Sequence, residues 1–325
     1  MLQSSEIKAQ AQAIGFHQVG IATVEDDQNN AQSASAQTAQ TLAAQNLQDW
    51  LNMGYHADME WMNSPKRADI KKLMPTARSV ISLALNYYTP HQHSEDPEDG
   101  KISRYGWGRD YHKVMGKKLK ALSMWLEAQA DHIVTRHCVD TAPIQDKFWA
   151  QQSGIGWIAK NRNVISTQYG SWLFLGEIIT NLDLTPDKPH SQHCGTCTRC
   201  LDACPTQAIT KPFVVDANRC IAYHTIENRA EELPLEIANN LSGWVAGCDI
   251  CQDVCPWNQR FAQETNVPDF QPYSANKQPK LQDLAQISES DWDRQFRASA
   301  LRRIKPEMLR RNARASLISR VKRPQ

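Results

Sequence analysis

Apolar and polar residues alternate along the first 185 residues in a way that predicts a mixture of helices and strands. Residues 7–13 carry apolar side chains at helical spacing and are followed by Gly15, a residue type that commonly ends helices. Residues 111–130 repeat the helical pattern, with lysines on the outer face. Apolar runs with the length of buried strands occur at residues 19–22, 79–88, 133–139 and 172–180. The pattern therefore predicts a sheet flanked by helices.

The pattern changes at two other places. Residues 25–45 are rich in Gln, Asn, Ala and Ser, which predicts a mobile insertion with at most a weak helix, and a helical pattern resumes at residues 47–53. After Ser288 the chain has the pattern of helices with arginines outward and five apolar residues inward, namely Trp292, Phe296, Ile304, Met308 and Leu309. We predict an α+β protein with an N-terminal domain at 1–185, a second domain at 186–262 and a helical tail at 263–325.

Composition and charge narrow the class. The chain has 325 residues, 41% of them hydrophobic, and no apolar run long enough to cross a membrane. Its N-terminus lacks the basic and apolar regions of a signal peptide, so we expect a cytoplasmic protein with no membrane partner. The net charge is only +1, but residues 293–325 hold eleven Lys or Arg against two acids. Such a tail is either a nucleic-acid contact or a solvated basic helix, and charge alone favours neither.

Eight of the nine cysteines lie between Cys194 and Cys255. The first run, Cys194-x2-Cys197-x2-Cys200-x3-Cys204-Pro, matches the spacing of bacterial ferredoxins, in which three cysteines hold one [4Fe-4S] cluster and the fourth holds the other. The second run, Cys248-x2-Cys251-x3-Cys255-Pro, lacks its first cysteine, and Cys220 can replace it. We therefore assign cluster one to Cys194, Cys197, Cys200 and Cys255, and cluster two to Cys204, Cys220, Cys248 and Cys251.

The same thiols allow other interpretations. Paired C-x2-C hooks also occur in zinc ribbons, but the proline after the last cysteine of each run is typical of ferredoxins. A disulfide framework suits small secreted chains, whereas this chain is long and has no export signal. Two iron–sulfur clusters are thus the favoured interpretation, and the remaining thiol, Cys138, is expected to be a buried strand residue.

Clusters carry electrons, so the preceding domain must hold what they reduce. Residues 154–159 fit the dinucleotide fingerprint G-x-G-x-x-A, but the residues before them have a helical pattern, so a tight turn with close backbone packing explains the glycines better. Asp140 follows a predicted strand, where a carboxyl group shielded by Trp149 and Trp157 would have a raised pKa and act as a proton donor. From its local sequence alone, a helix cap or turn residue is the favoured interpretation of Asp140.

The motifs together resemble the epoxyqueuosine reductases, cobalamin-dependent iron–sulfur enzymes of tRNA modification that are related to reductive dehalogenases. The resemblance extends from about residue 7 to residue 312. It is carried by the cysteine runs and by residues 103–112, 139–141, 156–161, 169–181, 220–227 and 248–258.

The resemblance implies a reaction and a site. The family reduces the epoxide of epoxyqueuosine in tRNA to the alkene of queuosine, with two electrons and two protons consumed and water released. Electrons would pass from the clusters to a cobalamin held by the N-terminal domain, and the position of Asp140 matches the proton donor. The implied cobalamin contacts are Arg67, Ser103, Asp140, Asn163, Val164 and Ile165.

The resemblance also implies partners. These are a tRNA that carries epoxyqueuosine at the anticodon and an external electron donor, and we expect a monomer. Members of the family often continue with further helical repeats, so here the basic tail is expected to contribute to tRNA binding. A reductive dehalogenase would carry an export signal, and a simple ferredoxin would not need the long domain before Cys194.

Overall fold

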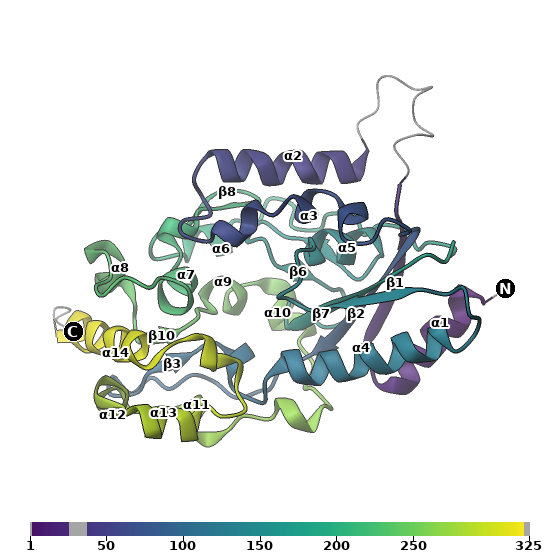
Figure 1. Cartoon of the computed structure of the whole chain (residues 1–325). Helices are drawn as coiled ribbons and strands as arrows, with labels where there is room; N and C mark the ends of the chain where they lie inside the picture. The colour runs from purple at the N-terminus through teal and green to yellow at the C-terminus, as the bar shows by residue number, and fades with distance from the viewer. Residues whose placement is uncertain (1, 26–37, 322–325) are drawn as a thin grey trace.

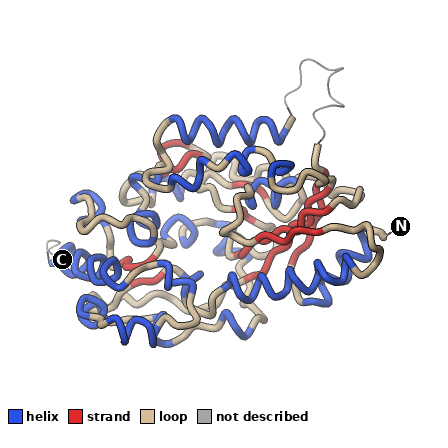
Figure 2. The backbone as a smooth tube through the Cα atoms, in the orientation of Figure 1, coloured by secondary structure: helices blue, strands red, loops and turns tan. Residues whose placement is uncertain are grey.

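The computed structural model describes residues 2–25 and 38–321, and its N-terminal half is built on a four-stranded antiparallel sheet. The strand order is β1-β2-β7-β4. The strands are β1 (Gln18–Thr23), β2 (Ser79–Asn86), β4 (Thr135–Cys138) and β7 (Leu173–Thr180). All four predicted strands are confirmed, with their ends shifted by at most two residues. Figure 2 shows that most of the strand structure lies in this one sheet.

Helices cover both faces of the sheet (Figure 1). On one face, α1 (Ser4–Ile14) and α4 (Tyr111–Glu127) pack over a core that includes Ile81, Leu83 and Leu85 of β2. On the other face, α5 (Asp146–Gln152) packs over the alternate residues of the same strand, Val80 and Ala84. Because successive strand residues point to opposite faces, a fully buried strand is apolar along most of its length. The predicted sheet flanked by helices is therefore confirmed.

Helix α2 (Ala39–Asn52) begins earlier than the predicted helix at residues 47–53. The hydroxyl of Thr38 caps its first turn by accepting a hydrogen bond from the Thr41 amide at 3.2 Å. Leu42, Ala43 and Ala44 are good helix formers and extend the helix toward this cap. Residues 26–37 of the predicted mobile insertion lie outside the described residues.

Short elements surround the cysteines. The helices of this region are α3 (Pro65–Ala68), α6 (Arg199–Asp202), α7 (Ile221–Ile226), α8 (Leu235–Asn240), α9 (Ile250–Asp253) and α10 (Pro256–Phe261). Two hairpins accompany them, β5 (Trp157–Ile158) with β6 (Val164–Ile165) and β8 (Ile209–Lys211) with β9 (Val214–Val215). Elements this short have little apolar surface of their own, so bound clusters are expected to contribute much of the stability here.

The tail folds as helices α11 (Ser274–Lys277), α12 (Leu281–Gln286), α13 (Glu289–Gln295) and α14 (Pro306–Val321). All five residues predicted to point inward are buried. Their core also contains Ile102 and Trp107 from the first third of the chain. Strand β3 (Lys101–Ile102) pairs in parallel with β10 (Trp244–Ala246), and both lie beside α14 in Figure 1. A segment distant in sequence thus completes the core of the tail.

The glycine pair at residues 154 and 156 makes the predicted tight turn. Gly154 has a φ of +80°, and a Cβ atom on Gly156 would lie 2.3 Å from the carbonyl oxygen of Ile165. A helix, α5, precedes the turn, so the context of a dinucleotide site is absent from this segment. Within residues 2–25 and 38–321, no helix has the length and apolar character needed to span a membrane.

Candidate active site and cluster-binding site

The structure brings the clustered thiols together in the two predicted sets of four. Burial, and then the charges of Cys255, Cys194 and Cys197, raise the pKa of Cys200 to about 11. In the second set, burial and then Cys251 and Cys220 raise the pKa of Cys248. The pKa of Cys251 is raised by burial and then by charges that include those of Cys220, Cys200 and Cys204. Because the charge of Cys200, in the first set, raises the pKa of Cys251, in the second, the two sets lie next to each other.

The spacing within the sets suits clusters. Among the described residues, no three His, Cys, Asp or Glu side chains converge closely enough to hold a single metal ion. A [4Fe-4S] cube keeps its four thiolate ligands further apart, because each thiolate binds a different iron. Each set supplies four thiols, the number that one [4Fe-4S] cube requires.

Lys160 and Asn161 brace the loops that carry the cysteines. The buried Lys160 donates hydrogen bonds through Nζ to the carbonyl oxygens of Gly195 at 2.6 Å and Cys197 at 2.9 Å. Asn161 donates through Nδ2 to the carbonyl oxygen of Cys251 at 3.1 Å. One turn of the β5–β6 hairpin thus fixes a loop from each cysteine run.

A buried ion pair ties the second cysteine run to the N-terminal half. Ser103 donates a hydrogen bond to Asp249 Oδ1 at 2.5 Å, and the Arg104 amide donates to Asp249 Oδ2 at 2.8 Å. The Arg104 guanidinium contacts both Asp249 and Asp253 and lies 4.9 Å from the ring of Trp172. Ser103 was predicted as a cobalamin contact, but its hydroxyl is already used to hold the loop between Cys248 and Cys251.

Asp140 lies just beyond β4 in a left-handed backbone conformation, with a φ of 42°. Non-glycine residues adopt this conformation uncommonly, and Asp is among those that tolerate it. About half of its side chain is exposed, and Asp140 Oδ2 lies 2.9 Å from Nε2 of His112. The other ring nitrogen of His112, Nδ1, lies 2.7 Å from Asp110 Oδ1. His112 therefore bridges two carboxylates.

The pKa of Asp140 is shifted downward, opposite to the predicted direction. Desolvation raises it, but the hydrogen bond and charge of His112, with smaller effects of Tyr111 and Arg303, bring the pKa below its usual range. Desolvation lowers the pKa of His112, but its bonds to Asp110 and Asp140 outweigh this and raise the pKa to about 9. The raised carboxyl pKa is therefore wrong for the protein without ligands, because the proton resides on the histidine.

The tryptophans predicted to shield Asp140 lie elsewhere. Trp149 packs among the apolar side chains around Cys138, and Trp157 packs beside Cys255. An aromatic stack holds the site instead. The ring of His112 stacks on Tyr111 at 4.1 Å, and Tyr111 stacks on Phe174 at 4.2 Å with an interplanar angle of 6°.

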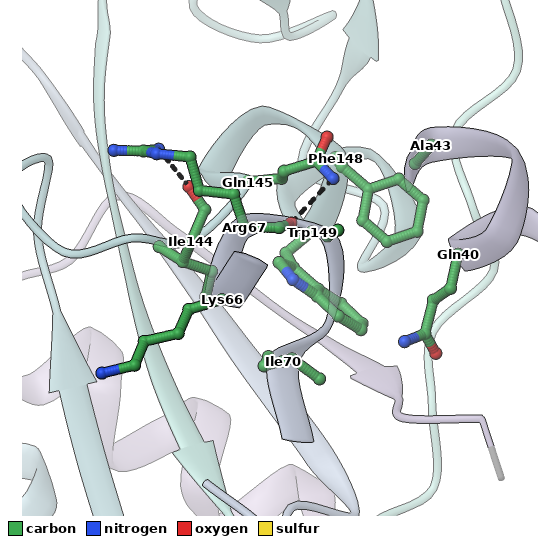
Figure 3. Close-up of a pocket in the computed structure, with 10 residues that line it drawn as sticks. Gln40, Ala43, Lys66, Arg67, Ile70, Ile144, Gln145, Phe148 and Trp149 are labelled. Atoms are coloured by element: carbon green, nitrogen blue, oxygen red, sulfur yellow. Dashed lines mark hydrogen bonds between the residues drawn. The ribbon is translucent and has the colours of Figure 1, made fainter. Parts of the chain in front are cut away.

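Arg67 lies on α3 near the same carboxyl groups. Its pKa is lowered by burial, which the charges of Asp146 and Asp140 partly offset. Figure 3 shows the side chain turned away from the pocket between α2 and α5 and donating to the carbonyl oxygen of Ile144, at 3.0 Å. Its Nε is buried without a hydrogen-bond partner among the described residues. The pocket in Figure 3 measures about 10 Å³, the volume of one water molecule, so a cofactor cannot occupy it.

One lysine is within electrostatic reach of both Asp140 and a cysteine of the second set. Burial lowers the pKa of Lys147, and the charge of Arg162 lowers it further. The charges of Asp146, Cys251 and Asp140 act in the opposite direction and raise it. Lys147 therefore lies between the second cysteine set and the acid.

The predicted contacts Asn163, Val164 and Ile165 lie around β6. Val164 and Ile165 pair with β5 and bury their side chains in two different apolar clusters. The Asn163 amide is held by Asn161, and its carbonyl oxygen accepts a hydrogen bond from Ala159. Only groups on the free edge of this hairpin remain for a ligand.

The tail arginines contact their own chain. Arg303 forms a two-pronged ion pair with Glu227, at 2.8 and 2.5 Å, and Arg311 donates to the carbonyl oxygens of His224 and Asn228. Arg302 pairs with Asp293. Arg310 and Arg314 donate hydrogen bonds to the main-chain carbonyl oxygens of Ile287 and Ala285. Much of the basic charge therefore has a structural use, which the charge pattern alone did not indicate.

Several site residues were missed from the sequence. His112, Tyr111 and Arg104 lie in the 103–112 segment that carries the resemblance, but nothing in their spacing indicates a contact with residues 140 or 249. Lys147 and Arg303 have no local signal at all. The pairing of residues so distant in sequence follows only from the fold.

Known proteins match this arrangement. The family model "Epoxyqueuosine reductase QueG, DUF1730" matches residues 67–141, and the "4Fe-4S double cluster binding domain" matches residues 193–258. An epoxyqueuosine reductase from Synechocystis sp. is 65% identical over 299 residues, which are 92% of this chain and 100% of the relative. The chain belongs to the epoxyqueuosine reductase family. The α+β class and the two-cluster module predicted from the sequence are thereby confirmed.

Solved structures of the family superpose closely. An epoxyqueuosine reductase solved with an epoxyqueuosine-modified stem loop of tRNA-Tyr is 32% identical, with a TM-score of 0.84 over 96% of this chain and 80% of that one. The enzyme from Bacillus subtilis is 29% identical, with a TM-score of 0.83 over the same shares. It was solved with an aspartate catalytic loop swung out of its active site. The fold described above is therefore that of the family.

Proposed function

We propose that this protein reduces the epoxide of epoxyqueuosine in a tRNA to the alkene of queuosine. The observation that carries the proposal is the position of Lys147, on which the charges of both Cys251 and Asp140 act. A cluster ligand and a candidate acid therefore lie within electrostatic reach of one lysine, which supports a site where electrons and a proton are delivered together. The relative solved with a modified tRNA stem loop supports a tRNA as the substrate.

The residues around this site fit a corrinoid. Arg67 has a buried Nε with no partner among the described residues. Arg162, in the turn of the β5–β6 hairpin, has a φ of 66° and a pKa lowered by burial. Arg67, Asp140 and the edge of the hairpin at Asn163, Val164 and Ile165 would hold the amide groups of the corrin ring, and Ser103 would act through the loop that it fixes. When bound, cobalamin supplies a cobalt centre reducing enough to open a strained ring.

Asp140 is the proposed proton donor. Bound substrate would cover its exposed half and remove water, which raises the pKa of a carboxyl group toward the range of a useful acid. Its proton would then go to the epoxide oxygen as the carbon–oxygen bond breaks, which avoids expelling an alkoxide. The swung-out aspartate loop of the Bacillus subtilis enzyme supports a mobile role for the segment that carries this acid.

The partners follow from this reaction. We propose a monomer that works in the cytoplasm on the anticodon of its tRNA and receives electrons from an external donor. Since many tail arginines pair within the chain, the tRNA backbone would be held by the remaining exposed cations of the tail and by the domain face. Binding should weaken steeply with salt, and a flat response would remove the electrostatic contribution.

The direct test uses the complete protein. Anaerobically reconstituted protein with both clusters and cobalamin is reduced and mixed with tRNA bearing epoxyqueuosine, and the digested tRNA is analysed by mass spectrometry. Queuosine should appear in proportion to time and enzyme. Unchanged epoxyqueuosine, with iron and cobalamin fully loaded, would refute the proposed activity.

A further inference from the structure

His112 carries a proton for a geometric reason. Its two ring nitrogens face Asp110 Oδ1 at 2.7 Å and Asp140 Oδ2 at 2.9 Å. Ionised carboxylates only accept hydrogen bonds, so both nitrogens must donate and the ring must be an imidazolium. The raised pKa of His112, about 9, agrees with this arrangement. The ring also lies in the first turn of α4, where the helix dipole disfavours a cation, and the two carboxylates offset that cost.

The proposed reaction needs two protons at one atom. An epoxide, two electrons and two protons give an alkene and water, and both protons end on the oxygen that leaves. The first proton turns the epoxide oxygen into a hydroxyl group as one carbon–oxygen bond breaks. The second turns that hydroxyl group into water as the other bond breaks. A single carboxyl group beside this oxygen is therefore spent halfway through the reaction.

We propose that His112 stores the second proton and passes it to Asp140 between the two bond cleavages. Asp140 takes up a proton from solvent as bound substrate covers it, and in the first step it loses this proton to the epoxide oxygen. In the second step the His112 Nε2 proton moves across the hydrogen bond to the Asp140 carboxylate. The reprotonated Asp140 then gives this proton to the hydroxyl group, and water leaves. The bound clusters and corrinoid would supply the electron pair, and His112 recovers its proton from solvent. This inference rests on the proposed function.

The surroundings of His112 suit a residue that holds a proton in reserve. Asp110 holds the second ring nitrogen, and the stack on Tyr111 fixes the plane of the ring. Of the other charged groups, Lys113 acts on Asp110 and Arg303 acts on Asp140, both lowering the carboxyl pKa. The phenol of Tyr105 also lies near Asp140. Its pKa is raised most by burial, next by the charge of Glu227 and then by the charge of Asp140. These groups keep Asp110 ionised and the second proton on the imidazole until Asp140 has given its own proton to the epoxide oxygen.

The test compares His112→Gln with wild type in single-turnover reactions of the fully loaded, reduced protein. Glutamine preserves a hydrogen bond but carries no ionisable proton. We expect the rate at pH 8 to fall about 10- to 100-fold with KM within about twofold, because one proton transfer is lost. The wild-type rate should fall as pH rises through about 9, where His112 loses its proton, and this fall should be absent in the variant.

Two further variants separate storage of a proton from orientation of Asp140. In Asp110→Asn the pKa of His112 drops, so the fall in rate should move to lower pH, and the histidine resonance that His112→Gln removes should titrate correspondingly lower by NMR. The matched control His137→Gln changes an exposed histidine of β4 and should match wild type.

The outcomes are distinct. If His112→Gln lowers the rate by the same factor at every pH, or leaves it unchanged, His112 does not store the proton. The same conclusion follows if Asp110→Asn leaves the pH profile in place. If wild type itself produces no queuosine, the proposed function fails instead.

Discussion

Two carboxyl groups near the end of β4 have opposite charge states. Glu177 on β7 is directly opposite Cys138, the last residue of β4, and Asp140 lies two residues further along the chain. Glu177 is fully buried, and neither of its oxygens has a hydrogen-bond partner among the described residues. Burial therefore raises the pKa of Glu177 well above its usual range, whereas His112 brings that of Asp140 below it.

The difference shows that partners outweigh position in setting the charge of a carboxyl group. Both acids lie near the end of β4, yet only Asp140 has a cationic partner. Ser82 is the other cross-strand neighbour of Glu177, and its hydroxyl group has no hydrogen-bond partner among the described residues. This row of the sheet therefore provides no group that would stabilise a negative charge on Glu177. A buried acid without a partner stays neutral, and an acid paired with a histidine ionises.

The largest expected effect is on turnover. Asp140→Asn should lower the single-turnover rate about 10²- to 10⁴-fold, because an amide cannot donate the proton that a general acid supplies. The iron content and the visible spectrum should stay those of wild type. Asp131→Asn, in the exposed turn before β4, is the control and should keep full activity. An active Asp140→Asn protein would mean that another group is the acid.

The second expected effect is on stability and its pH dependence. Because the pKa of Glu177 is raised in the folded protein, its contribution to the free energy of unfolding is fully present below the unfolded pKa of about 4.3. This contribution is lost as the pH rises toward the folded pKa. Glu177→Gln does not titrate, so its advantage over wild type should grow between pH 6 and pH 8.5. We expect a gain of about 1–3 kcal/mol at the upper end, measured by anaerobic urea unfolding.

Glu289→Gln, at the exposed start of α13, is the matched control for the stability experiment. Its unfolding free energy should follow that of wild type at both pH values. A constant difference between Glu177→Gln and wild type would show that Glu177 is ionised in the folded protein.

The smallest expected effect is at Cys138. Burial raises the pKa of this thiol to about 12, and the charged groups that act on it are Glu177 and Arg136 rather than the cysteines of the two runs. Cys138→Ala should retain about eight irons per chain, the content of two [4Fe-4S] clusters, and lose about 1 kcal/mol of stability. Cys251→Ser should instead lose iron. Loss of iron from Cys138→Ala would contradict the assignment of the eight ligands.

Local sequence was enough for the features that depend on spacing. The strands were predictable because buried strands are apolar along their length, and the two-cluster module because the cysteine runs have ferredoxin spacing. Asp140 was singled out by its place after a strand, but its role came only from the resemblance to a family.

Features that depend on long-range contacts were not predictable. His112 reaches Asp140 because α4 and the end of β4 meet on the same side of the sheet, and no pattern within residues 103–112 encodes this. Arg104 reaches Asp249 across 145 residues. The direction of the Asp140 pKa failed for the same reason, since burial was foreseen but the cationic partner was not.

The crossing of thiols between the two runs has a consequence for biosynthesis. In the predicted assignment each cube takes ligands from both cysteine runs, so Cys255 is needed for the first cube as much as Cys204 is for the second. A ribosome must therefore release nearly the whole cysteine region before a carrier can deliver either cube into a complete site. Maturation of the two centres is coupled, and a chain truncated between the runs would leave both unfinished.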